Sequence, residues 1–526
     1  MKRFYITIIV LLGAMITLAY LYFSKLNRDT NEGEASLYAA TAKSGLIFAF
    51  ENEKSILDLL GSQDLLQRLL PQKELKNLQA LHTHLLTKPE LSALVKNENI
   101  YLSFLPGEQR DINFLVSTQT TEKLDPTLLF ELLTAKGIKV ENQETFSKLT
   151  LSDTSVFYLA HKKNLILLSP SYQVISESLR SIEKPKQQAF IAYIKENSLF
   201  SKNSLATLYL NFDLLEGLLK QVTPSRLKQE FRLLNQQQAF ANLSYRYSKD
   251  RILFNGNTSI QAENNYLNLF SESKPEKVTI DAILPESTAS YAIYMPGPYK
   301  NWQPKLTQWF QAGNKSKLVD NTMKRMSTIY RLDPNLTFPQ YFNNQMVTFQ
   351  LKSRETMGAI NLSNGDKLRQ LLIEVSTVHS NDISIFKDDH LLFSFFGEAF
   401  EKFKRPYYTI VDNYLVFSNR ASTVQSFLYN YRNNKQLINK KAYREAFDQL
   451  STQSNVIFYV DHHNSERIAL HNLYLPYYRM YSSVDHLGEF DATILQLTGD
   501  QKNFQTNMLL SKVPEIVAEP DSIPSF

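Results

Sequence analysis

The sequence predicts an α+β protein in which an N-terminal transmembrane helix precedes two tandem copies of a mixed helix and antiparallel-sheet unit. Three observations support this prediction. Residues 4–23 form an uncharged apolar run, short strand-like runs joined by turn residues alternate with helix-like periodic stretches, and several of these blocks recur about 250 residues later.

The leading apolar run is long enough to cross a bilayer. Its twenty residues contain no charge and no proline, and as a helix they would extend about 30 Å. Lys2 and Arg3 precede the run, which places the N-terminus in the cytoplasm and the bulk of the chain outside. A cleaved signal peptide is the alternative, but residues 21–23 are bulky where a cleavage site needs small residues. We therefore predict a single-pass inner-membrane protein facing the periplasm, with the membrane as a partner of residues 4–23.

Composition limits the chemistry. The 526 residues include no cysteine, which excludes disulfides, thiolate metal sites and cysteine nucleophiles. A 43% hydrophobic content permits a large core, and the net charge of +5 is small for this length. No run of four lysines and arginines occurs, so no nucleic-acid partner is predicted.

After the apolar run, residues 24–35 predict a polar stalk, and the first α+β copy follows at residues 36–270. A strand is predicted at 45–50, helices at 55–70 and 75–86, and a hairpin of strands 100–105 and 112–117.

Internal similarity predicts the repeat. Residues 164–169 align with residues 413–418 at a separation of 249, and residues 208–211 align with residues 458–461 at a separation of 250. In both copies a turn dipeptide joins two strands, Lys163-Asn164 in the first and Asp412-Asn413 in the second. The linker is predicted at residues 271–277, the second copy at 278–511 and a disordered, proline-rich tail at 512–526.

The anchor, the repeated strand-turn-strand-helix block and the cysteine-free exterior resemble a family of Gram-negative envelope proteins defined by a domain of unknown function. The resemblance covers roughly residues 36–511. It implies a membrane-anchored, periplasm-facing protein, and it supplies no catalytic residues.

Polar clusters offer candidate sites, although a structural role is the favoured interpretation of each. His462-His463 are predicted at a strand end, where adjacent side chains diverge and serve one metal ion poorly. His82 and His84 diverge on a helix, and Asp388-Asp389-His390 are predicted as a hairpin turn. Asp485, His486, Glu489 and Asp491 form an acidic cluster without calcium-loop spacing. No catalytic, cofactor-binding or metal-binding residue is predicted.

Aromatic residues distinguish the second copy from the first. A core role is favoured for them, and the alternative is a groove for an apolar ligand. The residues proposed for that groove are Tyr291, Tyr294, Trp302, Tyr474, Tyr477 and Tyr478.

The sequence therefore predicts a periplasmic module of the cell envelope that binds or scaffolds an envelope protein and is not an enzyme. A carrier or chaperone for a lipid or other apolar ligand is the first alternative. An envelope hydrolase with a dispersed site is the second.

Overall fold

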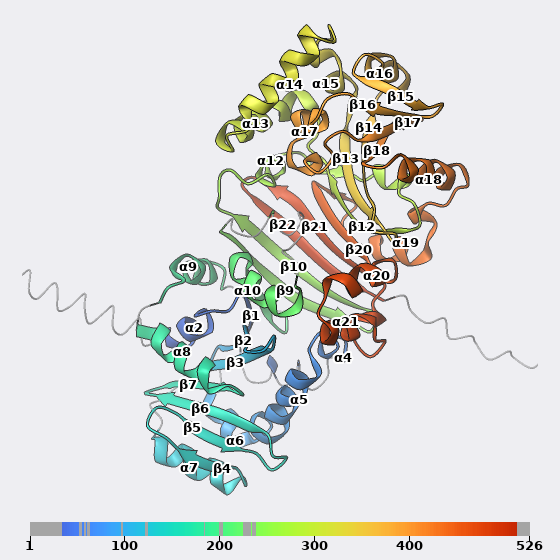
Figure 1. The fold of residues 1–526 in the computed structure, drawn as a ribbon. Coiled ribbons are helices and arrows are strands. Elements are labelled where there is room, and N and C mark those ends of the chain that lie inside the picture. Colours follow the sequence, from blue (N-terminus) through green and yellow to red (C-terminus); the bar gives the residue numbers. More distant parts are fainter. Residues whose placement is uncertain are drawn as a thin grey trace, which may run out of the picture. The chain divides into compact units, whose positions relative to one another are not determined.

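The computed structural model describes residues 34–51, 55, 56, 59, 64–95, 98–120, 125–183, 185–198, 204–224, 233 and 238–512 (Figure 1). The chain divides into two compact units. Unit 1 comprises Met1–Ser62 and Gln72–Phe200, and unit 2 comprises Gln63–Pro71 and Ser201–Phe526. Both combine helices with antiparallel strands, which is the α+β class.

Unit 1 contains seven antiparallel strands in the order β1-β2-β3-β7-β6-β5-β4. They are β1 (Leu46–Phe50), β2 (Ile100–Pro106), β3 (Ile112–Gln119), β4 (Lys139–Asn142), β5 (Ser147–Thr150), β6 (Val156–Lys162) and β7 (Leu165–Ser169). The helices are α2 (Ala35–Ala40), α5 (Gln72–Leu81), the π-helix η1 (His82–Leu86), α6 (Pro89–Ser92), η2 (Ala93–Val95), α7 (Pro126–Ala135), α8 (Tyr172–Glu183) and α9 (Gln188–Glu196).

Helices α2 and α8 pack on this sheet. Ala35 and Ala39 of α2 meet Leu115 and Leu167 in the core, together with Ile175 of α8. The small alanine side chains allow the short helix to approach the strands closely. The predicted stalk of residues 24–35 therefore extended too far, because Ala35 is buried in the fold. Residues 24–33 of the predicted stalk lie outside the described residues.

The second copy repeats the same strand order within unit 2, β12-β13-β14-β18-β17-β16-β15. Its strands are β12 (Thr288–Tyr294), β13 (Phe342–Leu351), β14 (Thr356–Leu362), β15 (Ser376–Ser380), β16 (Ile383–Phe386), β17 (Tyr407–Val411) and β18 (Tyr414–Ser418). Both predicted turn dipeptides form two-residue hairpins, and their first residues, Lys163 and Asp412, have φ values of 59° and 48°.

The helices of this copy lie on both faces of its strands. Helices α18 and α19 supply Phe427 and Tyr443 to the core formed with Tyr291 and Ile494, whereas α20 lies on the opposite face, where His462 meets Thr493. The helices are α13 (Tyr299–Ala312), α14 (Ser316–Thr328), η4 (Pro334–Leu336), α15 (Phe338–Tyr341), α16 (Gly365–Leu372), α17 (Leu391–Phe396), η5 (Gly397–Phe400), α18 (Ala421–Arg432), η6 (Leu437–Asn439), α19 (Lys441–Phe447), α20 (His462–Asn472), α21 (Leu475–Ser482) and η7 (Leu487–Glu489).

Unit 2 also joins the last strands of the two copies. The strand order β8-β9-β10-β22-β21-β20-β12 extends its sheet, with β8 (Thr207–Asn211), β9 (Ala239–Ser248), β10 (Arg251–Ile260), β20 (Val456–Asp461), β21 (Ala492–Asp500) and β22 (Asn503–Ser511). Asn255 of β10 faces Asn507 of β22, and its Nδ2 donates to the Asn507 Oδ1 at 2.5 Å. These residues hold equivalent places in the two hairpins, so a local pseudo-two-fold axis passes between them.

The predicted domain boundary does not coincide with this division. Residues 271–277 lie inside unit 2, where α12 (Asn268–Ser271) ends and β11 (Glu276–Lys277) pairs with β19 (Gln453–Ser454). The hairpin β9–β10, assigned to the first copy, belongs to unit 2 because β22 pairs with the free edge of β10.

The predicted transmembrane helix requires a correction of both the fold class and the location. Residues 4–23 lie outside the described residues, and no helix that the structure describes is long and apolar enough to cross a membrane. Even α13 has only 14 residues, against the roughly 20 that a bilayer requires. The predicted single-pass inner-membrane location depended on that helix, so it is overturned as well. The predicted tail also lies outside the described residues after Lys512.

Candidate functional site

Three of the six aromatic residues proposed for a ligand groove are in the core. Tyr291, Tyr294 and Trp302 are 3%, 2% and 1% exposed. Tyr291 stacks on Tyr459 with ring centroids 4.9 Å apart, and its hydroxyl lies 2.9 Å from that of Tyr443. These side chains pack against neighbouring rings and leave no surface for a ligand, so the favoured core role holds for these three residues and the groove alternative does not.

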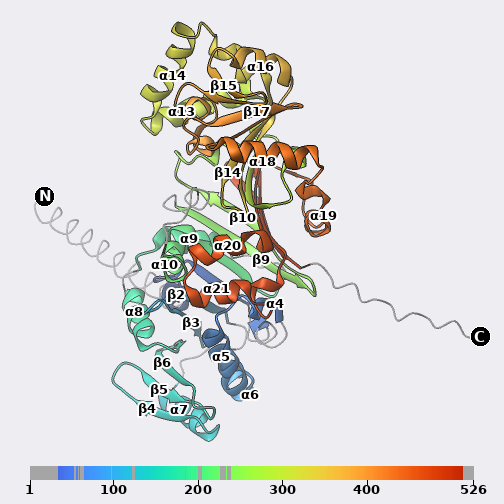
Figure 2. The same ribbon diagram turned by 45° about the vertical axis from the view of Figure 1, so that its right-hand side comes forward.

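The other three aromatic residues lie elsewhere in unit 2. Tyr474, Tyr477 and Tyr478 are half-buried at α21, whereas Trp302 lies on α13 at the opposite end of the unit in both views (Figures 1 and 2). The structure therefore does not bring the six residues together.

The two adjacent histidines begin helix α20 instead of ending a strand. Asp461 caps this helix by accepting from the backbone N–H of Asn464 at 2.8 Å. The first two helical positions point about 100° apart, so the predicted divergence of His462 and His463 holds for a different reason. His462 is buried and His463 is exposed.

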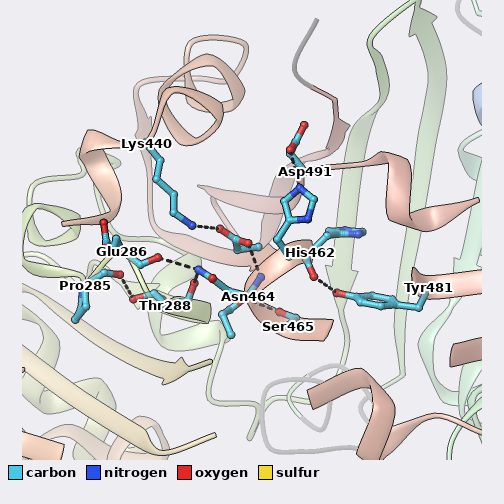
Figure 3. A network of polar contacts seen from close by, with 12 residues as sticks. Pro285, Glu286, Thr288, Lys440, His462, Asn464, Ser465, Tyr481 and Asp491 are labelled. Atoms are coloured by element: carbon cyan, nitrogen blue, oxygen red, sulfur yellow. Dashed lines mark hydrogen bonds and ion pairs between the residues drawn. The ribbon is translucent and has the colours of Figure 1, made fainter. Parts of the chain in front are cut away.

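His462 serves as a packing group. Its ring stacks on Tyr481 with centroids 5.3 Å apart (Figure 3). Its Nε2 lies 2.8 Å from Thr493 Oγ1, and its Nδ1 lies 3.2 Å from the Leu487 carbonyl. Burial lowers the pKa of His462 to about 4. Both ring nitrogens are thus engaged by neutral partners, which leaves no lone pair for a metal ion or a substrate.

Polar side chains around His462 fasten α20 to the sheet. Lys440 forms an ion pair with the cap Asp461 at 3.0 Å. The amide of Asn464 donates to the carbonyls of Glu286 and Thr288, both at 2.8 Å, as Figure 3 shows. These charge-assisted and buried hydrogen bonds orient helix α20. This structural role is sufficient to explain why polar side chains gather here.

The acidic cluster does not converge on one point. Asp491 binds His463 at 3.2 Å, and this hydrogen bond raises the pKa of His463. Glu489 instead pairs with Arg68 and, at 2.6 Å, with Lys512, while Asp485 is exposed. Across the residues with a described placement, no group of three or more His, Asp and Glu side chains could hold a metal ion.

His84 has a serine and an aspartate beside its two ring nitrogens. Ser152 Oγ lies 3.1 Å from Nδ1, but Asp153 lies 3.8 Å from Nε2, which is beyond hydrogen-bond distance. Asp153 also accepts from Ser155, and Ser152 and Asp153 are exposed to water. Without a hydrogen bond from His84 to Asp153, the three residues do not form the oriented arrangement by which a catalytic triad activates its serine.

Asp388 forms an ion pair that stabilises the fold. Asp388 is 8% exposed and binds Arg325 of α14 at 2.5 Å. His390 has φ 61° and precedes α17, so this segment leads from a strand into a helix, and the predicted hairpin turn between two strands is wrong.

A surface that the sequence analysis missed lies on helices α13 and α14, which are side by side at one end of unit 2 (Figures 1 and 2). Residues 295–341, between β12 and β13, contain seven lysines and arginines and only two acidic residues, a net charge of +5. The equivalent stretch of the first copy, residues 51–99 between β1 and β2, has six basic and seven acidic residues, a net charge of −1.

Part of this positive charge is unneutralised. Lys305, Lys315 and Arg325 pair with acidic side chains of the fold. Four exposed cations have no ion-pair partner among the described residues, and three aliphatic side chains nearby are 37% to 55% exposed. We name the following seven residues the basic helical surface: Lys300, Lys317, Lys324, Arg331, Leu318, Ile329 and Leu336.

A sequence signal for this surface existed. Once the two copies are aligned, the charge of each inter-strand stretch can be compared, and the difference of six charges between equivalent stretches indicates a different surface role.

Comparisons with known proteins add no identification. No protein-family model, no curated protein and no solved structure matches the chain.

Proposed function

We propose that the protein is a non-catalytic binding module whose basic helical surface takes an acidic segment of a partner protein. The observation that carries the proposal is the concentration of unpaired positive charge and exposed aliphatic side chains on α13, on α14 and in the segment from α14 to η4. The equivalent stretch of the first copy lacks the positive charge, so the surface is not a requirement of the shared fold.

The spacing of the cations suits a polypeptide. Lys317 and Lys324 are seven residues apart, so they lie about 10 Å apart on one line of α14. Leu318 is 37% exposed beside this line, and Ile329 is 55% exposed after the helix. Covering exposed aliphatic side chains with apolar groups of a partner lowers the free energy of the complex. Binding to a nucleic-acid phosphate backbone, by contrast, requires only the positive charges. An acidic segment with aliphatic residues therefore matches both features.

The remaining polar clusters support binding over catalysis. His462, Asp461 and Glu489 are engaged in contacts that hold α20 and its neighbours in place. The hydrolase alternative required Asp485, Glu489 and a histidine in one pocket, and this convergence is not observed. The carrier alternative is weakened because Tyr291, Tyr294 and Trp302 fill the core.

The test is site-specific photocrosslinking of the full chain in intact cells. A photoreactive residue replaces Asn321, which is exposed between Lys317 and Lys324, and in a parallel strain it replaces Tyr429 of α18, which is 61% exposed. We expect a discrete protein adduct from position 321 and none of the same mass from position 429.

Charge reversal separates specific from general attraction. Lys317→Glu with Lys324→Glu should remove the adduct at position 321. The matched pair Lys404→Glu with Lys435→Glu, two other exposed lysines of unit 2, changes the net charge equally and should preserve it. An adduct that survives the first pair, or disappears with both, would refute the proposed surface.

A further inference from the structure

A short segment near the N-terminus belongs to unit 2, although both stretches that flank it belong to unit 1. Residues Gln63–Pro71 form this segment, and its helix α4 (Asp64–Gln67) contacts β10. Leu66 is 8% exposed, while the neighbouring Leu65, Leu69 and Leu70 are half-buried. The segment therefore combines four leucines that are buried or half-buried with one arginine that contacts unit 2 directly.

Arg68 is recognised through its side chain and its backbone. Its guanidinium donates to the Val484 carbonyl at 2.9 Å and forms an ion pair with Glu489. His486 Nδ1 lies 3.3 Å from the Arg68 carbonyl. These contacts come from the stretch between α21 and η7 and from η7 itself.

The Glu489 side chain that binds Arg68 is also held in place by another residue. The Glu489 side chain is only 13% exposed, and Lys512 holds its Oε1 at 2.6 Å, which leaves Oε2 for the arginine. Both contacts are made by one guanidinium nitrogen, Nη1, so the site recognises a long cationic side chain through a fixed carboxylate and a backbone carbonyl. We name Val484, His486, Glu489 and Lys512 the Arg68 site.

We propose that the Arg68 site is a docking site for a leucine-rich peptide with one arginine, and that residues 64–70 are its built-in ligand. A partner protein with a segment of the same chemistry competes with them for the site. This site is separate from the basic helical surface, and its test is independent of the proposed function.

The contacts that hold the built-in ligand are individually weak. The Arg68 side chain is 32% exposed, and partly exposed ion pairs contribute little stability. A tethered ligand nevertheless occupies its site, because the connection to the chain gives an effective concentration in the millimolar range. A competing segment needs only a moderately higher intrinsic affinity to displace it.

The test is a binding titration with a fluorescein-labelled peptide of residues 64–71 (DLLQRLLP) and the full chain. Wild-type protein should bind it weakly, since its own segment fills the site. The variant Arg68→Ala loosens that segment, and we expect it to bind the peptide at least tenfold more tightly, as measured by fluorescence anisotropy.

Specificity is checked on both partners. Adding Glu489→Gln to Arg68→Ala should weaken peptide binding at least tenfold, while Asp485→Asn, at an exposed carboxylate nearby, should leave it unchanged. A peptide in which alanine replaces Arg68 should bind more weakly than the unmodified peptide. Equal affinity of wild type and Arg68→Ala, or no binding to Arg68→Ala, would overturn the proposal.

A measurement on the unmutated protein guards against a folding defect in the variants. The N–H of Arg68 donates to the Asp64 carbonyl at 3.2 Å in the docked segment. Excess peptide should accelerate hydrogen exchange in residues 64–70 of the wild-type chain without changing exchange in α5. An unchanged exchange pattern at saturating peptide would contradict displacement.

Discussion

Glu74 of unit 1 provides a sharp test of the buried electrostatics. Its side chain is on α5 and is 1% exposed, and neither carboxyl oxygen has a hydrogen-bond partner among the described residues. Burial raises the pKa of Glu74 to about 7, from 4.5 in the unfolded chain. The folded state therefore binds more protons than the unfolded state between these values, so stability should fall as the pH rises from 4.5 through 7.

The magnitude follows from the shift. A difference of about 2.5 pKa units corresponds to roughly 3 kcal/mol at pH values well above 7. Local relaxation and water entry reduce such penalties, so we expect about 2 kcal/mol. Glu74→Gln keeps the shape and removes the charge, so it should be about 2 kcal/mol more stable than wild type at pH 8.5 and no more stable at pH 4.

Hydrogen exchange of α5 peptides is the suitable assay, because both tryptophans are in unit 2 and the two units need not unfold together. Glu90→Gln is the matched control, since Glu90 is exposed and its hydrogen bond to Lys136 lowers its pKa. A stability difference between Glu74→Gln and wild type that does not change with pH would refute the reasoning.

Two further predictions concern unit 2. Burial depresses the pKa of His462 to about 4, so the unfolded state binds more protons between pH 6.5 and 4, and stability should decline by about 2 kcal/mol as the pH falls through this window. His462→Gln should flatten this decline in urea unfolding followed by tryptophan fluorescence, and an unchanged slope would contradict the assignment. Gly256→Ala should destabilise unit 2 by about 3 kcal/mol or more, because a Cβ there would lie 1.9 Å from the Asn242 carbonyl oxygen. The control Gly297→Ala, also in unit 2, brings its Cβ no closer than 3.9 Å to Glu276 Oε1 and should cost only about 1 kcal/mol, through its positive φ, so equal losses in thermal unfolding would exclude the steric cause.

Local patterns predicted many of the strands and turns. The two-residue turns at Lys163 and Asp412 were predictable because a hairpin of this length needs residues that tolerate positive φ. Helix α20 was missed because its apolar pattern is weak, although Asp461 offered a cap signal that matches Asn211 before α10 (Phe212–Val222). The groove alternative could not be decided from the sequence for a different reason. The alternation of side chains along β12 shows which of them share a face of the sheet, but it does not show whether another layer covers that face.

Local patterns in the sequence were enough to predict the α+β class and the short-range elements, because periodicity, turn chemistry and caps act over a few residues. Tertiary structure decided what lies between distant segments. Three contacts join residues more than 100 positions apart: β10 pairs with β22, Arg68 forms an ion pair with Glu489, and the hydroxyl of Tyr291 contacts that of Tyr443. Such contacts form because edge strands and apolar faces need partners, and the identity of the partner depends on the whole fold.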